Sequence, residues 1–329
     1  MKEKRVFVAG ATGVLGRRVV ELLVSQGHAV TGVARSAARA EGLRESGAEP
    51  VEIDLFDPHA VRGAVRGHDA VMNLATSIPP GSAAARKSSW AMNHRIRREA
   101  SDNLALAAAI EGVSTLIQES ITLLYGDGGV STLDERAPTE PTWITASALD
   151  AERHCLRFGQ RGGAAVVLRF AGFYGSDSHH TQDLITAAHK GWAMSMGPRS
   201  AYLSSITTDD AARAAVAALN ATSGVYNVSD DAALTREEHF AALADALGMR
   251  RLRHPPAFVG RLMGPKMAMV LRSHRVVSDK FKTATGWKPK HSDAWSGWRA
   301  IVGVNGTRGS PRGAPEERLR RTTKPQLRG

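Results

Sequence analysis

Three glycines near the start of the chain have a spacing that suits phosphate binding. They lie in GATGVLG, which follows the apolar run RVFVAG and precedes a segment whose apolar residues have helical spacing. Glycine lets the backbone turn sharply and approach a pyrophosphate, whose charge sits against the amides at the N-terminus of the helix. A glycine motif between an expected strand and an expected helix is specific evidence for a dinucleotide site. We expect contacts from Gly10, Thr12, Gly13, Val14, Leu15 and Gly16.

The end of the second expected strand, AVTGVA (29–34), indicates which dinucleotide binds. An acidic residue there would accept hydrogen bonds from a ribose 2′-hydroxyl and repel a 2′-phosphate. This chain instead has Arg35 and Ser36, with Arg39 nearby, a charged fork and a hydroxyl that suit the phosphate. We expect NADP(H) in preference to NAD(H); the alternative is a solvated arginine at the start of a helix.

Two further strands should end at the same edge of a parallel sheet, where a dinucleotide lies. They are PVEID (50–54) and AVMNLA (70–75). Asp54 is placed to accept from an adenine amino group. The remaining cofactor contacts expected from these strand ends are Leu55, Leu74, Ala75 and Thr76, with Ser77 expected to face substrate.

The bulk composition narrows the class of protein. The chain has 329 residues, 43% of them apolar, and no apolar run of about 18 residues that would suggest a membrane span. MKEKRVFVAGATG has no signal-peptide pattern, so we expect a cytoplasmic protein. One cysteine, Cys155, excludes an internal disulfide and a multi-cysteine zinc site, and no metal site is expected.

The formal net charge of +11 raises the question of nucleic-acid binding. Much of the excess lies in a tail, where seven basic residues between Arg308 and Arg328 stand against Glu316 and Glu317. A tail rich in Pro, Gly and Arg has little to bury, and we expect residues 303–329 to be disordered. We expect no specific nucleic-acid partner.

Several motifs in order resemble the extended short-chain dehydrogenase/reductase family, which includes nucleotide-sugar epimerases and dehydratases. Besides GATGVLG they include NLAT, QESITLLYGD, VVLRFAGFYG and SITTDDAARAAVAAL, and the resemblance runs from about Arg5 to Trp298. It implies an α/β fold: a doubly wound parallel Rossmann sheet in residues 1–174, to which some later segments return. A smaller substrate-binding part would occupy residues 175–302. It also implies a homodimer formed through helices near 89–112 and 145–160.

The same resemblance implies positions for site residues. Asn93 matches the family's active-site asparagine, and Ser120 falls near its serine or threonine. Phe173 would lie beside the nicotinamide ring, with Tyr174 near the substrate. Counting back from Tyr125, however, the family hydroxyl falls on Ile121, between Ser120 and Thr122, so either hydroxyl remains a candidate.

The family's catalytic tyrosine and lysine, four residues apart, are missing. Anchored on Glu152, the alignment puts Ile144 at the tyrosine and Ala148 at the lysine, and residues 138–157 contain neither residue type. In that pair the ammonium lowers the phenol pKa, and the phenol exchanges a proton with the substrate oxygen. The family's usual hydride mechanism is therefore in doubt, although the cofactor motifs are present.

Replacements would come from other residues. Glu119 beside Ser120 suggests a base and its relay, or equally a carboxylate that orients the cofactor. His179 and His180, expected in a substrate-facing loop, suggest a proton donor; the alternative is exposed histidines without a role. Trp143 offers an apolar wall or an indole donor.

In the second half, Thr235 and Glu238 form an expected capping box, and Thr207 lies near an expected N-cap. Arg272 and Arg275 are candidates for a substrate diphosphate. Three functions remain open. The first is an atypical NADP(H)-dependent oxidoreductase acting on a small molecule. The others are a non-redox enzyme such as a cyclase, isomerase, epimerase or dehydratase, and a non-catalytic NADP(H)-responsive binding protein.

Overall fold

A parallel sheet of seven strands organises the chain in the computed structural model, which describes residues 3–256 and 268–308. The spatial order is β11-β7-β5-β4-β1-β2-β3, and every pairing within the sheet is parallel. This order, with a crossover between β1 and β4, is that of a doubly wound Rossmann sheet. The expected fold class is confirmed. The strands are β1 Arg5–Ala9, β2 Ala29–Val33, β3 Glu49–Val51, β4 Ala70–Asn73, β5 Thr115–Ile121, β7 Ala164–Phe170 and β11 Gly224–Val228.

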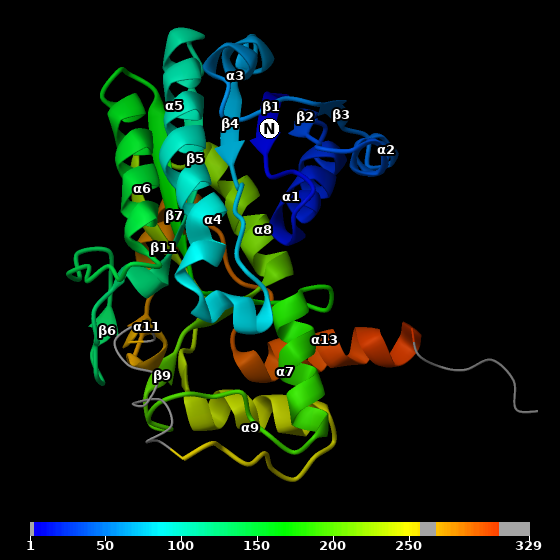
Figure 1. Ribbon diagram of the computed structural model, residues 1–329, viewed down its shortest axis with the longest axis vertical. Helices are drawn as coiled ribbons and strands as arrows, with labels where there is room; N and C mark the ends of the chain where they lie inside the picture. The colour runs from blue at the N-terminus through cyan, green and yellow to red at the C-terminus, as the bar shows by residue number, and fades with distance from the viewer. Residues whose placement is uncertain (1–2, 257–267, 309–329) are drawn as a thin grey trace, which may run out of the picture.

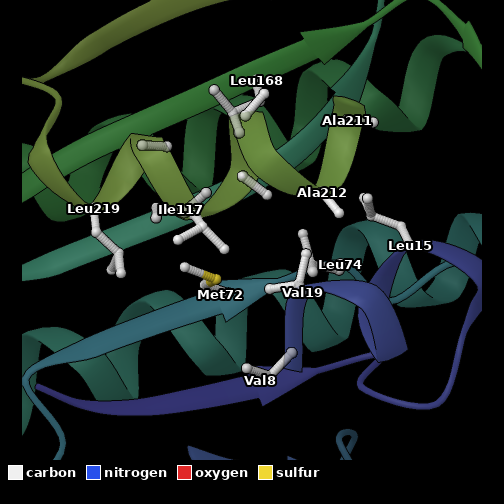
Figure 2. Close-up of a cluster of buried hydrophobic side chains, with 14 of the residues drawn as sticks. Val8, Leu15, Val19, Met72, Leu74, Ile117, Leu168, Ala211, Ala212 and Leu219 are labelled. Atoms are coloured by element: carbon white, nitrogen blue, oxygen red, sulfur yellow. The ribbon is translucent and has the colours of Figure 1, made fainter. Parts of the chain in front are cut away.

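Helices cover both faces of the sheet (Figure 1). One face packs against α1 Val14–Ser25, α2 Ala37–Glu45 and α8 Thr208–Ala217, and the other against α3 Pro58–Val65, α5 Ser101–Ile110 and α6 Ala146–Gly159. Figure 2 shows the first of these interfaces, where Leu15 and Val19 of α1 lie close to Ala212 of α8 and Met72 of β4. The buried strands are almost continuously apolar because helices cover both of their faces.

The helical segment expected over 89–112 has three parts. A 3₁₀ turn, Lys87–Trp90, leads into α4 Ala91–Arg95, and a π turn, Ile96–Ala100, connects α4 to α5. π turns occur mostly as single turns inside α-helices, often at functional sites. On the outer faces of α5 and α6, Leu106, Ile110 and Leu156 are exposed, on the surface through which we expected a dimer to form.

The smaller part of the fold lies at the carboxyl edge of the sheet (Figure 1). Its hydrophobic core includes Leu184, Phe240 and Trp298. Thr235 and Glu238 form the predicted capping box, and Thr207 caps α8 as expected. The elements of this part are β8 Gly172–Tyr174, α7 His179–His189, β9 Tyr202–Leu203, β10 Ser205–Thr207, β12 Leu234–Thr235, α9 Arg236–Ala246, α11 Ala268–Leu271, α12 Asp279–Thr285 and α13 Ala294–Arg308. The short strands β6 Thr132–Leu133 and β13 Arg275–Val276 pair with each other.

Ion pairs connect the first helix to the smaller part. Arg17 and Arg18, in the first turns of α1, both pair with Asp177, and Arg18 also pairs with Asp209 of α8. Arg18 Nη1 lies 2.7 Å from Asp177 Oδ2. The start of α1 and the loop before α7 are therefore held together.

Part of the segment expected to be disordered is helical. Residues 303–308, which we predicted to be disordered, continue helix α13, and the rest of the predicted tail, 309–329, lies outside the described residues. Among the helices that the structure describes, none is long and apolar enough to cross a membrane.

Candidate functional site

The glycine turn has the close backbone packing that its sequence predicts. Gly10 has a φ of +81°, and a Cβ added to it would lie 2.6 Å from the backbone carbon of Leu74. A Cβ on Gly16 would overlap the carbonyl oxygen of Gly10. Gly13 is the N-cap of α1, and the first turn of α1 contains no acidic residue. Because the first amides of a helix have no partner within it, this turn suits a pyrophosphate.

A pocket of about 580 Å³ adjoins this turn. We call it the dinucleotide pocket. Of the expected cofactor residues, the structure places Gly10, Thr12, Gly13, Arg35, Asp54, Leu55, Ala75 and Thr76 in its lining. Its lining also includes Val33, Arg39, Glu52, Ile53, Phe56, Met92 and Ile96. The glycine cradle and the flanking cations fit the phosphates of a nicotinamide dinucleotide.

Other expected cofactor residues lie outside this lining. The side chains of Leu15 and Leu74 are buried in the core, where they support the turn. Ser36 accepts a hydrogen bond from the Arg39 amide at 3.4 Å and is the N-cap of α2. Val14, Gly16 and Phe173 likewise do not line it; Phe173 packs beside Phe170, with ring centroids 5.2 Å apart.

Some charged groups in and beside the dinucleotide pocket bind other residues of the chain, whereas Arg35 is free to bind a ligand. Asp54 Oδ1 accepts from the Phe56 amide at 2.9 Å, which fixes the loop after β3. The Arg95 guanidinium lies 3.7 Å from the centre of the Phe56 ring and holds that side chain. Arg35 is exposed and, within the described part of the chain, has no ion-pair partner. Arg35 is therefore available to an anionic ligand.

Glu119 and Ser120, at the end of β5, have separate partners and do not form the expected base and relay. The Glu119 carboxylate is 4% exposed and accepts from Arg97 Nη2 at 3.0 Å through both oxygens. Ser120 Oγ instead donates to Glu152 Oε1 at 2.6 Å. Neighbouring residues on a strand point to opposite sides, which is why their partners differ.

Glu152 of α6 is the centre of a buried polar network. Arg169 of β7 donates to both of its carboxylate oxygens, at 2.8 and 2.7 Å. Arg169 also donates to the Tyr125 hydroxyl, which donates to Asn227 Oδ1 at 2.7 Å. Burial disfavours the charged guanidinium, but the hydrogen bonds and charge of Glu152 raise the pKa of Arg169 above its ordinary value. The network joins β5, α6, β7 and β11 through Tyr125 and Asn227.

The positions aligned with the missing tyrosine and lysine are filled by apolar packing. Ile144, just before α6, is 3% exposed, and Ala148 in its first turn is fully buried. Ile144 packs with Trp90 and Met269, and Trp143 lies at the edge of the same cluster. We call Trp90, Trp143, Ile144 and Met269 the apolar wall. The buried Nε1 of Trp143 has no hydrogen-bond partner among the described residues.

Other candidate residues near this region are only partly paired. Asn93 is 1% exposed and accepts from the Ser77 amide at 2.9 Å, so two predicted site residues do meet. Its Nδ2 has no partner among the described residues. Thr122, one of the two hydroxyl candidates, is buried in the 3₁₀ turn Thr122–Leu124, and Ile121 is half-buried at the end of β5.

Three predictions for the second half differ from the structure. His179 and His180 begin helix α7 and do not lie in a loop; both are exposed. Tyr174, expected at the substrate, is 2% exposed and packs against Trp298 in the core of the smaller part, with ring centroids 4.8 Å apart. Burial raises the pKa of the Tyr174 hydroxyl far above its ordinary value.

The two arginines considered for a diphosphate bind the protein itself. Arg272 donates to the carbonyl oxygens of Tyr125 and Glu140, at 2.9 and 2.7 Å. Arg275 lies over the Tyr202 ring. Both side chains therefore hold segments of this chain together.

Sequence reasoning missed several site residues. Arg97 and Arg169 were not singled out, although an arginine inside an apolar strand such as VVLRF is a signal for a buried partner. Met92 and Ile96, on one face of the α4 segment, line the dinucleotide pocket. Their spacing of four residues was the available signal.

Comparison with known proteins places this site in a family. The model of the NAD dependent epimerase/dehydratase family matches residues 6–229. The chain belongs to this family. A curated relative from Streptomyces, named 3-diazoavenalumate denitrifying reductase, is 31% identical over 319 residues, which cover 91% of this chain and 99% of the relative.

Solved structures of epimerases share the fold. A UDP-glucose 4-epimerase of Thermus thermophilus in complex with NAD has a TM-score of 0.75 and 25% identity and covers 93% of this chain and 100% of its own. A UDP-glucose 4-epimerase of Thermotoga maritima with UDP-glucose has a TM-score of 0.76 and 20% identity, over 92% and 99% of the two chains. This chain of the epimerase/dehydratase family therefore has a nicotinamide-dinucleotide fold.

We predict that Glu152→Gln lowers the free energy of unfolding by about 3 kcal/mol, because it leaves the buried Arg169 guanidinium without a carboxylate. Urea denaturation measures this change. Asp150→Asn, on the same helix, is the matched control, because its ion pairs with exposed arginines should contribute at most about 1 kcal/mol. Equal losses in the two variants would contradict the importance of the buried pair.

Proposed function

We propose that the chain is an NADP(H)-dependent reductase of a small molecule, whose acceptor needs no proton from the protein during hydride transfer. The glycine turn would hold the pyrophosphate, and Arg35, helped by Ser36 and Arg39, the 2′-phosphate. When bound, the reduced nicotinamide supplies a hydride. The residues of this chain would bind the cofactor, orient the acceptor and exclude water.

The main support for this proposal is that apolar residues align with the family's proton-transferring side chains. By alignment, Ile144 and Ala148 stand where the family has a phenol and an ammonium group. Neither of these side chains can exchange a proton. Reduction of a ketone produces an alkoxide that must be protonated, and oxidation of an alcohol releases a proton, so both reactions would lose their usual catalyst. An epimerase reaction through such an oxidation is disfavoured for the same reason.

An arenediazonium ion is an acceptor that removes this requirement. When hydride replaces the diazonium group of an arene, a carbon–hydrogen bond forms and the carbon–nitrogen bond breaks. Dinitrogen leaves with the bonding electron pair, the arene carbon is reduced, and NADPH becomes NADP⁺. The balanced reaction neither consumes nor releases a proton. The relative from Streptomyces, named as a denitrifying reductase of a diazo compound, supports this class of substrate.

The apolar wall suits such an electrophile in a second way. Water competes with hydride for an arenediazonium ion and gives a phenol. Trp90, Ile144 and Met269 form a buried cluster at the position of the family's phenol, which would keep water from that side of the acceptor. The same substitution would thus remove a proton donor and protect the substrate.

Isotope tracing tests the proposed hydride transfer. The protein is mixed with a benzenediazonium salt and NADPH deuterated at C4, and nicotinamide absorbance and product mass are followed. We expect enzyme-dependent oxidation and a benzene product that carries the deuterium, because hydride alone enters the new bond. Unlabelled NADPH in deuterated water should give an unlabelled product. Turnover no faster than in the mixture without protein would contradict the proposal for this probe.

Cofactor preference gives a separate prediction. Arg35→Ala should weaken NADP(H) binding by about tenfold or more, because a charge-assisted hydrogen bond contributes about 1.5–3 kcal/mol, and should change NAD(H) binding little. Fluorescence titration measures both affinities. Arg44→Ala, which removes an exposed arginine of α2 paired with Glu41, is the control. Equal weakening of both dinucleotides would count against the 2′-phosphate assignment.

The apolar wall can be tested by the products formed. Ile144→Asn should admit water and raise the phenol-to-arene ratio several-fold, with the phenol oxygen derived from heavy-oxygen water. Ile144→Val, which keeps the wall apolar, should leave the ratio close to that of the original protein. Mass spectrometry measures the ratio, and circular dichroism checks that both variants are folded. The same ratio in both variants would show that the wall does not exclude water.

A further inference from the structure

A second large pocket lies in the smaller part of the fold. Its volume is about 700 Å³, and it is bounded by the end of α7, the first half of α9 and residues 250–254. We call it the basic pocket. It shares no lining residue with the dinucleotide pocket. Its cationic lining consists of Lys190, Arg199, Arg250, Arg251, Arg253 and His254.

Acidic residues in the described part of the chain do not balance the charge of these cations. The lining contains one carboxylate, that of Glu237, against five permanently charged side chains. Within residues 3–256 and 268–308, none of the five has an ion-pair partner, whereas arginines elsewhere, such as Arg62, Arg157 and Arg299, are paired. Burial and the nearby Arg199 lower the pKa of His254. The concave surface therefore has a strong positive potential.

The backbone under these side chains is well fixed. Arg253 donates its amide to the Gly191 carbonyl at 2.8 Å and accepts from the Ala193 amide at 2.9 Å. Phe240 and Leu252, both in the lining, are buried in the core of the smaller part. The His254 ring lies edge-on to Phe240, with centroids 5.9 Å apart. Exposed guanidinium groups thus project from a rigid, apolar base.

We propose that the basic pocket binds a small polyanion with two or more phosphate groups. The planar guanidinium group of arginine can donate two hydrogen bonds to phosphate oxygens. Several arginines around one pocket provide more positive charge than a ligand with a single carboxylate would need. The volume is that of a small-molecule site, and the cations gather around a concavity. The site is separate from the reductase chemistry and does not rest on it.

Calorimetric titration of the full chain with inorganic tripolyphosphate tests this assignment. We expect one site per chain, and the same site when NADP⁺ is saturating, because the dinucleotide pocket is elsewhere. The double variant Arg251→Ala with Arg253→Ala should weaken binding at least tenfold. Both side chains are exposed, so the fold should be retained, and the affinity for NADPH should not change.

A matched control separates a site from diffuse surface charge. Arg86→Ala with Arg161→Ala removes two exposed arginines outside both pockets and should leave tripolyphosphate binding unchanged. Equal weakening by the two double variants, or several weak sites per chain, would overturn the proposal. Loss of the site in saturating NADP⁺ would assign it to the dinucleotide pocket instead. Tighter binding of a single-stranded oligonucleotide through the same arginines would favour a nucleic-acid surface and overturn the small-ligand assignment.

Discussion

The buried carboxylate of Glu152 is the interaction on which the site region depends. It accepts from Ser120 and twice from Arg169, and through Arg169 it reaches Tyr125 and Asn227. A buried charge is costly unless its partners satisfy it, so these five side chains must fold together. They fix the ends of β5 and β7 against the middle of α6. The apolar wall can then take a defined position at this edge of the sheet.

Within that framework, the two residues that we align with the family's tyrosine and lysine lie close together in the chain. Ile144 precedes α6, and Ala148 lies in the first turn of that helix. Glu119 is held by Arg97 and Ser120 by Glu152, whereas Asn93 Nδ2 and Trp143 Nε1 have no partner among the described residues. We infer that this region orients the acceptor and excludes water. Such a site suits an acceptor that reacts with hydride without acid catalysis.

The sequence allowed prediction of features set by local rules. The glycine turn, the strand ends and the capping box at Thr235 depend on residues close together in the chain, and the structure has each of them. The partner of Glu119 could not be predicted, because Arg97 comes from a helix 22 residues earlier and strand direction alone does not choose among nearby cations. His179 was misplaced because a short polar segment resembles a loop until Leu184 and Ile185 give α7 a buried face.

The contacts of Asp177 have a mechanical consequence. This residue, in the loop before α7, pairs with the two arginines that directly follow Gly16. The loop cannot swing away from α1 without giving up both pairs, and a shift of α1 would pull on the loop. Binding of a dinucleotide at the glycine turn should therefore restrict the motion of the loop before α7. Occupancy of the dinucleotide pocket would in this way be coupled to the smaller part of the fold.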